Sequence, residues 1–166
     1  MKYNHQNERK LLLKMAEDTI YSAKGHFKAC DIRRNAITIT IFVCIILNIL
    51  GIISIGNVID RCLSAICLIG TIALLIWDYG EGKDYRAKHK ATAEKYLALH
   101  KEIRNYYFLY NYTKEQVEQL SKKVILLDQS EKLEIPFFAR KLAKRAIEKK
   151  DPEIDNWFLS TNVDKQ

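Results

Sequence analysis

A length of 166 residues is typical of one domain, and 27 Lys and Arg against 20 Asp and Glu give the chain a net charge of +7. The cysteines exclude a zinc site or a disulfide framework of the CxxC type, because no two of them have that spacing. They are Cys30, Cys44, Cys62 and Cys67. We interpret them as small apolar packing residues in a reducing compartment.

The N-terminal segment, residues 1–35, is predicted to form an amphipathic cytoplasmic helix over about residues 8–34. Small and apolar side chains recur at spacings of three and four, with charged residues on the other face. They are Leu12, Ala16, Thr19, Ala23, Phe27 and Cys30. Because no proline occurs before residue 136, this helix is free to continue into the segment that follows.

Two apolar runs in residues 36–77 dominate the interpretation. The first covers residues 36–55, and twenty helical residues span about 30 Å, the thickness of the hydrocarbon core of a bilayer. The second has sixteen uncharged residues and is long enough once Val58 and Ile59 are added, which gives a span over residues 58–77. We predict a transmembrane hairpin with a very short external turn. The alternative is a soluble bundle, in which such long apolar runs are rare.

The charge distribution predicts the orientation of the hairpin. Residues 1–35 carry eight Lys and Arg against four Asp and Glu, residues 83–166 carry eighteen against thirteen, and residues 36–82 carry one against three. Lys and Arg are enriched on the cytoplasmic side of membrane proteins, so both termini are predicted to be cytoplasmic. The positive charge of the two flanking segments is then explained by their cytoplasmic placement and by contact with anionic headgroups of the lipid bilayer. No direct contact with nucleic acid is expected.

The last segment, residues 78–166, is predicted to be a cytoplasmic helical stalk and tail. Gly80 and Gly82 loosen the helix at the membrane exit, and a long helix over residues 83–112 then pairs with the N-terminal helix. Its heptad-like stripe consists of Tyr85, Thr92, Tyr96, Leu99, Ile103, Tyr106 and Tyr110. A capping box of Thr113 and Gln116 starts the next helix, which ends in a turn over residues 128–130.

A final helix is predicted to begin at Pro136, in its first turn, and to end near Glu148. Its apolar face is assigned to Ile135, Phe138, Leu142 and Ala146. The same helix carries the basic residues Arg140, Lys141, Lys144 and Arg145. We interpret them as a solvated or headgroup-binding face, or as an anion site, for example for a nucleotide phosphate. One short turn with Trp157 and Phe158 and a frayed tail over residues 159–166 complete the chain.

No catalytic constellation is visible in the sequence. It contains no phosphate loop, no GxSxG and no HExxH. The histidines His5, His26, His89 and His100 are dispersed, and we interpret His89 and His100, on one helix face, as packing or surface residues. The sequence therefore predicts no enzyme activity, no cofactor and no metal site.

Polar residues inside the predicted spans are costly in lipid, so their positions are informative. The first span carries a stripe of Thr40, Cys44, Asn48 and Gly51, and the second a stripe of Ser64, Cys67, Thr71 and Asp78. Such stripes either pack one helix against another or line a water path. A single hairpin has too few helices to enclose a pore, so conduction would require a homo-oligomer.

The layout of the chain, with the segments KHKATAEKYLALHKEIRNYY at residues 88–107 and IPFFARKLAKRAI at residues 135–147, resembles the SLATT family of small bacterial two-transmembrane proteins. The resemblance implies an all-α fold, a two-helix transmembrane hairpin with long cytoplasmic helices forming a bundle, in the bacterial inner membrane. It also implies an effector of anti-phage conflict systems, encoded beside a nucleotide-messenger synthase or a reverse transcriptase. The family offers no catalytic residues to carry over.

The leading hypothesis is a pore-forming effector of antiviral defence that oligomerises and is opened by a cytoplasmic signal, such as a nucleotide messenger or a defence-system partner protein. Asn48 and the level of Thr40 and Thr71 are the predicted lining or gating positions. The alternative is a membrane-anchored scaffold that recruits a cytoplasmic partner without conductance. A constitutive small channel is a third hypothesis.

Overall fold

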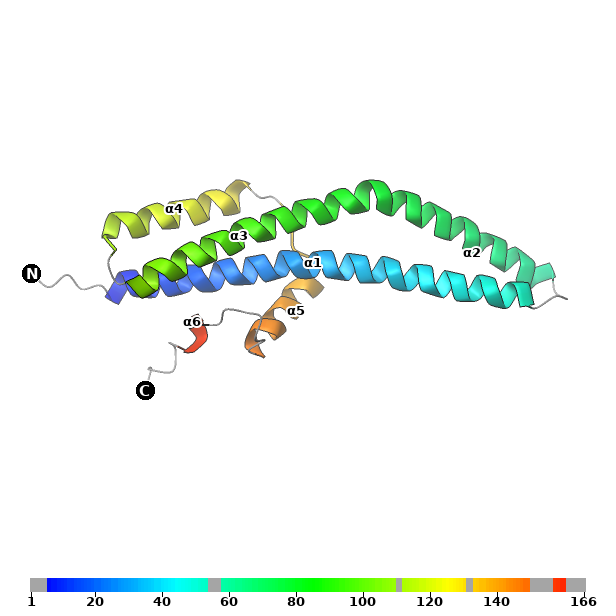
Figure 1. The fold of residues 1–166 in the computed structure, drawn as a ribbon, viewed down its shortest axis with the longest axis horizontal. Helices are drawn as coiled ribbons and strands as arrows, with labels where there is room; N and C mark the ends of the chain where they lie inside the picture. Colours follow the sequence, from blue (N-terminus) through cyan, green and yellow to red (C-terminus); the bar gives the residue numbers. More distant parts are fainter. Residues whose placement is uncertain (1–5, 54–57, 110–111, 131–132, 150–156, 161–166) are drawn as a thin grey trace, which may run out of the picture. The chain divides into compact units, whose positions relative to one another are not determined.

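The computed structural model describes residues 6–53, 58–109, 112–130, 133–149 and 157–160, and these ranges consist of helices and short connecting segments without a strand (Figure 1). In chain order the elements are α1 (Gln6–Ile53), α2 (Val58–Trp77), the π-helix η1 (Asp78–Gly82), α3 (Lys83–Leu109), α4 (Lys114–Ser130), α5 (Phe137–Glu148) and α6 (Trp157–Ser160). The all-α fold predicted from the sequence is confirmed.

The chain divides into two compact units. The first, residues 1–29 and 89–166, is called here the bundle. The second, residues 30–88, is called the hairpin unit. Helix α1 contributes to both units without a break, as expected from the absence of proline in the first half of the chain.

The bundle is held together by an apolar core to which α1, α3, α4, α5 and α6 all contribute. Its buried members are Leu12, Met15, Ala16, Ile20, Ile103, Tyr107, Tyr112, Val117, Leu120, Val124, Ile147 and Phe158. Polar contacts join α1 to α3, because Arg9 Nε donates to Tyr107 Oη at 2.9 Å and His100 Nδ1 donates to the carbonyl oxygen of Ala16 at 3.0 Å. The predicted pairing of the N-terminal helix with the long helix is therefore confirmed.

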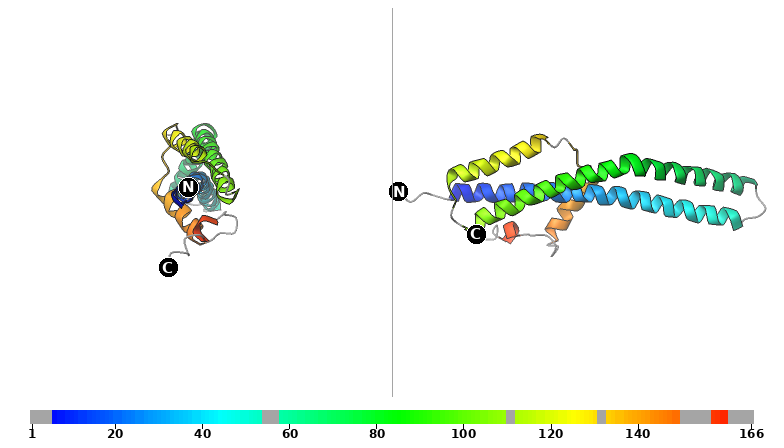
Figure 2. Two further views of the ribbon diagram at one scale, coloured as in Figure 1. Left: turned by 90° about the vertical axis from the view of Figure 1, so that its left-hand side faces the viewer. Right: turned by 45° about the horizontal axis from the view of Figure 1, so that its top comes forward.

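Helix α4 lies next to α3 in the end-on view of Figure 2, and two side-chain contacts join the pair. Its start is the predicted capping box, since the Thr113 amide donates to Gln116 Oε1 at 2.8 Å and the Gln116 amide donates to Thr113 Oγ1 at 3.3 Å. The predicted turn over residues 128–130 is wrong, because α4 continues to Ser130. Tyr96 Oη donates to Asp128 Oδ1 at 2.6 Å, and this contact with α3 accompanies the added helical turn.

The apolar face predicted for the last helix is displaced by one position in the structure. Ala139, Ala143 and Ile147 of α5 are at most 1% exposed, whereas Phe138 is 71% and Leu142 is 42% exposed. Two alanines on the inner face let the backbone of α5 approach the bundle closely, so the larger side chains point outward. Pro136 also precedes α5, as its N-cap, instead of lying within the first turn.

Aromatic and histidine side chains fill the space between α1, α3 and α6. His26 and His89 are buried, and their Nδ1 atoms lie 2.8 Å apart, so one ring donates a hydrogen bond and the other accepts it. Trp157 of α6 packs on the ring of Tyr107, with centroids 4.7 Å apart. The interpretation of His89 and His100 as packing residues agrees with their burial, at 1% and 0% exposed.

Candidate functional site

One polar contact joins the two apolar helices of the hairpin unit. Ser64 Oγ of α2 donates to Asn48 Oδ1 of α1 at 2.9 Å, and Asn48 Nδ2 donates to the carbonyl oxygen of Cys44 at 2.9 Å. The amide of Asn48 thus has one partner on its own helix and one on the other. Both side chains are half-buried between helices whose other faces are apolar. An asparagine in this position holds two apolar helices in one register.

The remaining residues of the predicted stripe on α2 share its less exposed face. Thr71 is 9% exposed, and its hydroxyl donates to the carbonyl oxygen of Cys67 at 2.7 Å. Ser64, Cys67 and Asp78 are half-buried, at helical spacing from Thr71. The structure therefore brings the three α2 residues of the predicted stripe to one face, and Asp78 follows them at the start of η1.

The stripe on α1 is only partly gathered by the structure. Cys44 is half-buried on the same side as Asn48, whereas Thr40 is exposed and donates to the carbonyl oxygen of Ala36 at 2.8 Å. Ile37, 8% exposed, takes the inner position one turn before. The surroundings of Gly51 lie outside the described residues.

The outer faces of both helices carry large apolar side chains that the hairpin unit does not cover. Phe42, Leu50, Ile59, Ile66, Ile69 and Ile76 are between 58% and 70% exposed. An eighteen-residue window within residues 6–50 and another within residues 61–109 are long and apolar enough to cross a membrane, and almost none of either window is buried in the structure. Such surfaces require lipid or another apolar partner.

The exit of α2 is built around Arg33. Its guanidinium lies between two aromatic rings, 4.4 Å from the centroid of Trp77 and 4.5 Å from that of Tyr85. This arrangement combines cation–π attraction with burial of the aliphatic stem. Trp77 Nε1 also donates to Glu81 Oε2 at 2.6 Å, which fixes the indole at the start of η1.

The predicted loosening at residues 78–83 takes the form of a π-helix. The Asp78 carboxylate forms an ion pair with Arg86 and lies over Gly82, where a Cβ atom would collide with it. Glycine at position 82 therefore leaves space for this ion pair, and the wider turn of η1 accommodates it. Single π-turns inside α-helices are frequent at functional sites.

The basic residues predicted on the last helix are together on the outer side of α5. Arg140, Lys141, Lys144 and Arg145 are all exposed. Arg140 Nε donates to the carbonyl oxygen of Ile135 at 2.9 Å, and Lys144 lies 3.7 Å from the carboxylate of Glu148. The cluster is therefore an open surface formed by one helix.

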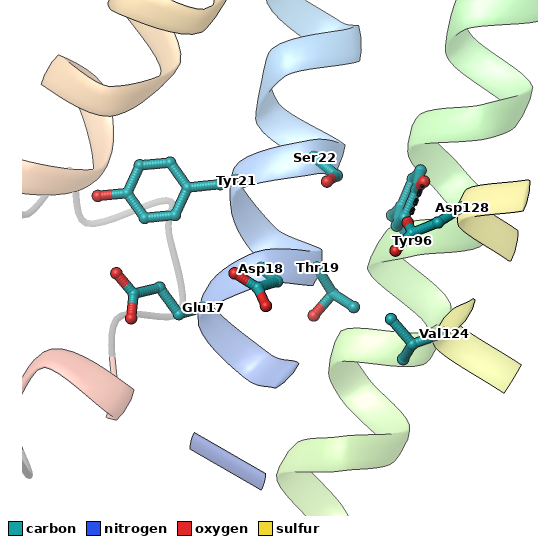
Figure 3. Close-up of a pocket in the computed structure, with 8 residues that line it drawn as sticks. All are labelled: Glu17, Asp18, Thr19, Tyr21, Ser22, Tyr96, Val124 and Asp128. Carbon is teal, nitrogen blue, oxygen red and sulfur yellow. Dashed lines mark hydrogen bonds between the residues drawn. The ribbon is translucent and has the colours of Figure 1, made fainter. Parts of the chain in front are cut away.

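A cavity of about 360 Å³ lies in the bundle between α1, α3 and α4 (Figure 3). Its lining residues are Glu17, Asp18, Thr19, Tyr21, Ser22, Tyr96, Val124 and Asp128. The pKa of Asp18 is raised above its ordinary value, mainly because the carboxyl group is partly buried. The nearby Lys14 lowers this pKa, and the carboxylate of Asp128 raises it. Three carboxylates make this cavity unfavourable for a phosphate group.

Sequence reasoning missed the cavity because its lining residues come from three helices and follow no sequence motif. In the part of the chain that the structure describes, no group of three His, Cys, Asp or Glu could hold a metal ion.

Two apolar helices joined as a hairpin, together with a helical bundle, define an all-α protein with two candidate membrane spans. The family model described as "SMODS and SLOG-associating 2TM effector domain 6" (SLATT_6) matches residues 4–145. The match covers most of the chain, which therefore belongs to this family of two-transmembrane effector domains and is a membrane protein. The resemblance noted in the sequence is confirmed. No curated protein and no solved structure matches the chain significantly.

Proposed function

We propose that the chain is a pore-forming effector of a bacterial antiviral defence system, placed in the inner membrane with both termini in the cytoplasm. The observation that carries the proposal is the contact between Asn48 and Ser64 inside an otherwise apolar hairpin. An inert anchor needs no amide at this depth, where a polar side chain that loses its partner is costly.

The hairpin as it stands is the closed form in this proposal. Asn48, Ser64 and Thr71 have their hydrogen-bonding groups satisfied within the hairpin, so no water path is required. Two helices cannot enclose a pore, and the exposed apolar side chains of α1 and α2 provide surfaces for contact with further copies. Opening then consists of separating Asn48 from Ser64 and turning both toward water at the centre of a homo-oligomer.

The signal acts on the cytoplasmic bundle and is either a nucleotide messenger or a partner protein of the defence system. Such a signal shifts the assembly only if it binds the open form more tightly than the closed form. The acidic cavity between α1, α3 and α4 does not favour a nucleotide phosphate, so this proposal does not place a nucleotide there.

The test replaces Asn48 by Leu and follows the membrane potential of cells with a voltage-sensitive dye after activation of the complete defence system. Asn48→Leu is expected to abolish depolarisation while the protein still inserts in the membrane. The matched control is Thr38→Val, which changes an exposed threonine of the same helix outside the predicted stripe and is expected to leave depolarisation unchanged. Full depolarisation with Asn48→Leu would contradict an aqueous role for the polar pair.

A scaffold without conductance is the second candidate, and exposed apolar residues of the bundle favour it. Phe108 and Leu109 at the end of α3 are 52% and 71% exposed, and Leu126 of α4 is 63% exposed. An intact membrane potential together with a stoichiometric partner lost on Leu109→Ser would support the scaffold. Depolarisation by the protein alone, without any signal, would instead indicate a constitutive channel.

A further inference from the structure

We propose that the outer face of α5 docks on the anionic surface of the bilayer in which the chain is anchored. The proposal starts from the apolar side chains that the structure leaves outside. Phe137 and Phe138 are 72% and 71% exposed, and Leu142 is 42% exposed. The two phenylalanine rings contact each other edge to face, with centroids 5.8 Å apart, and form an exposed apolar patch at the start of the helix.

The helical arrangement places basic and apolar groups on one side of α5. At 100° per residue, Phe137, Lys141 and Arg145 follow one another on the side opposite the buried Ala143. Phe138 and Leu142 lie next to this row. Apolar and basic side chains therefore share the outward half of α5. The apolar side chains can enter the boundary between headgroups and acyl chains, while the cations remain at the membrane surface.

Charge determines which partner fits this surface. Within residues 137–148 the four basic side chains are opposed by a single acid, Glu148, which already pairs with Lys144. A net charge of +3 is attracted to anionic lipid headgroups. A second copy bound face to face would bring the same positive face against itself, which costs electrostatic energy.

The start of α5 is fixed on α1. Ile135 packs over Gly25 so closely that a Cβ atom at position 25 would lie 2.9 Å from Ile135 Cδ1. Only ten residues of chain lie between Gly25 and Ala36, where the first apolar run begins. Because position 25 is glycine, Ile135 can pack against α1 and hold the start of α5 on the segment that leads into the predicted span.

The test measures the distance from α5 to lipid in the full chain, reconstituted at one copy per nanodisc. In a variant whose native cysteines are replaced by serine, Phe138→Cys carries a fluorophore that is quenched by nitroxide-labelled lipids. The same label at Glu118→Cys, on the exposed side of α4, is the matched control. Nanodiscs contain either phosphatidylglycerol or phosphatidylcholine. Hydrogen exchange of residues 137–148 in the unmodified chain provides a second readout that does not depend on the cysteine replacements.

Docking predicts quenching and slower exchange of α5 in phosphatidylglycerol nanodiscs, and neither effect in phosphatidylcholine or at position 118. Each basic charge near an anionic surface contributes about a fivefold factor, so the double variant Lys141→Glu and Arg145→Glu is expected to weaken docking at least about 25-fold. The control variant Lys101→Glu and Lys122→Glu makes the same change of net charge on α3 and α4.

Three results would overturn the proposal. Equal quenching at positions 138 and 118 would show that α5 is not at the lipid surface. Protection of α5 by free nucleotides but not by anionic lipid would assign the cluster to a soluble phosphate ligand. Protection that requires two copies per nanodisc would assign the face to a second chain. Each result can occur whether or not the protein forms a pore, so the proposed function is tested separately.

Discussion

The contact between Asn48 and Ser64 is open to a direct energetic test. Asn48→Ala, Ser64→Ala and the double variant form a mutant cycle, in which the coupling energy isolates the bond from Ser64 Oγ to Asn48 Oδ1. The cycle is needed because Asn48 also donates to the carbonyl oxygen of Cys44, and Asn48→Ala alone removes both bonds.

The expected coupling follows from measured hydrogen bonds between membrane helices, which average about 0.6 kcal/mol and reach about 1.7 kcal/mol. The bond here is 2.9 Å long and half-buried, so we expect a coupling energy between these two values. This corresponds to a factor of about 3 to 18 in the equilibrium between packed and separated helices.

The assay is steric trapping in micelles, with one biotin tag on α1 and one on α2, so that streptavidin binds both tags only when the helices separate. The control cycle pairs Thr40→Val with Ser64→Ala and is expected to show no coupling, since the Thr40 hydroxyl bonds within its own helix. Equal coupling in the two cycles would refute the assignment of Asn48 and Ser64 as partners.

Three further predictions concern the bundle and are measured by thermal or urea unfolding in detergent. Thr113→Ala is expected to cost about 1 kcal/mol through loss of the capping box, and Thr113→Ser much less; equal losses would contradict a capping role. Ile147→Ala should cost about 2 to 5 kcal/mol and Phe138→Ala less than about 0.5 kcal/mol, and the reverse order would show that the inner face of α5 is misassigned. The raised pKa of Asp18 means that its ionisation opposes folding, so this cost is absent at low pH and develops as the pH rises above 3.8. Asp18→Asn should therefore stabilise the protein at pH 7 and not at pH 3, and a pH-independent effect would exclude this cause.

The sequence predicted those features that depend on local patterns. Uninterrupted apolar residues indicated the helices of the hairpin unit, and the spacing of Thr113 and Gln116 indicated the start of α4. In both cases the determining interactions lie within one turn or one helix. The absence of proline likewise predicted the continuity of α1.

Features that depend on contacts between helices were missed or misplaced. The inner face of α5 was assigned to Phe138 because large apolar residues are usually buried, whereas here the close approach of two alanines decides the orientation. The end of α4 was placed too early because Asp128 is a good turn former, and its partner Tyr96 lies thirty-two residues away in the sequence. The acidic cavity could not be predicted for the same reason.

Arg33 combines two roles, because it carries a positive charge beside the first predicted span and a planar group between two aromatic rings. A lysine would preserve the positive charge on which the predicted orientation of the hairpin depends, but its compact ammonium cannot lie flat against both Trp77 and Tyr85. Arg33→Lys is therefore expected to keep the insertion topology while loosening the contact of α1 with Trp77 and Tyr85 at the membrane boundary. The charge and the shape of this one side chain therefore affect two different properties, the predicted orientation of the hairpin and the rigidity of the junction.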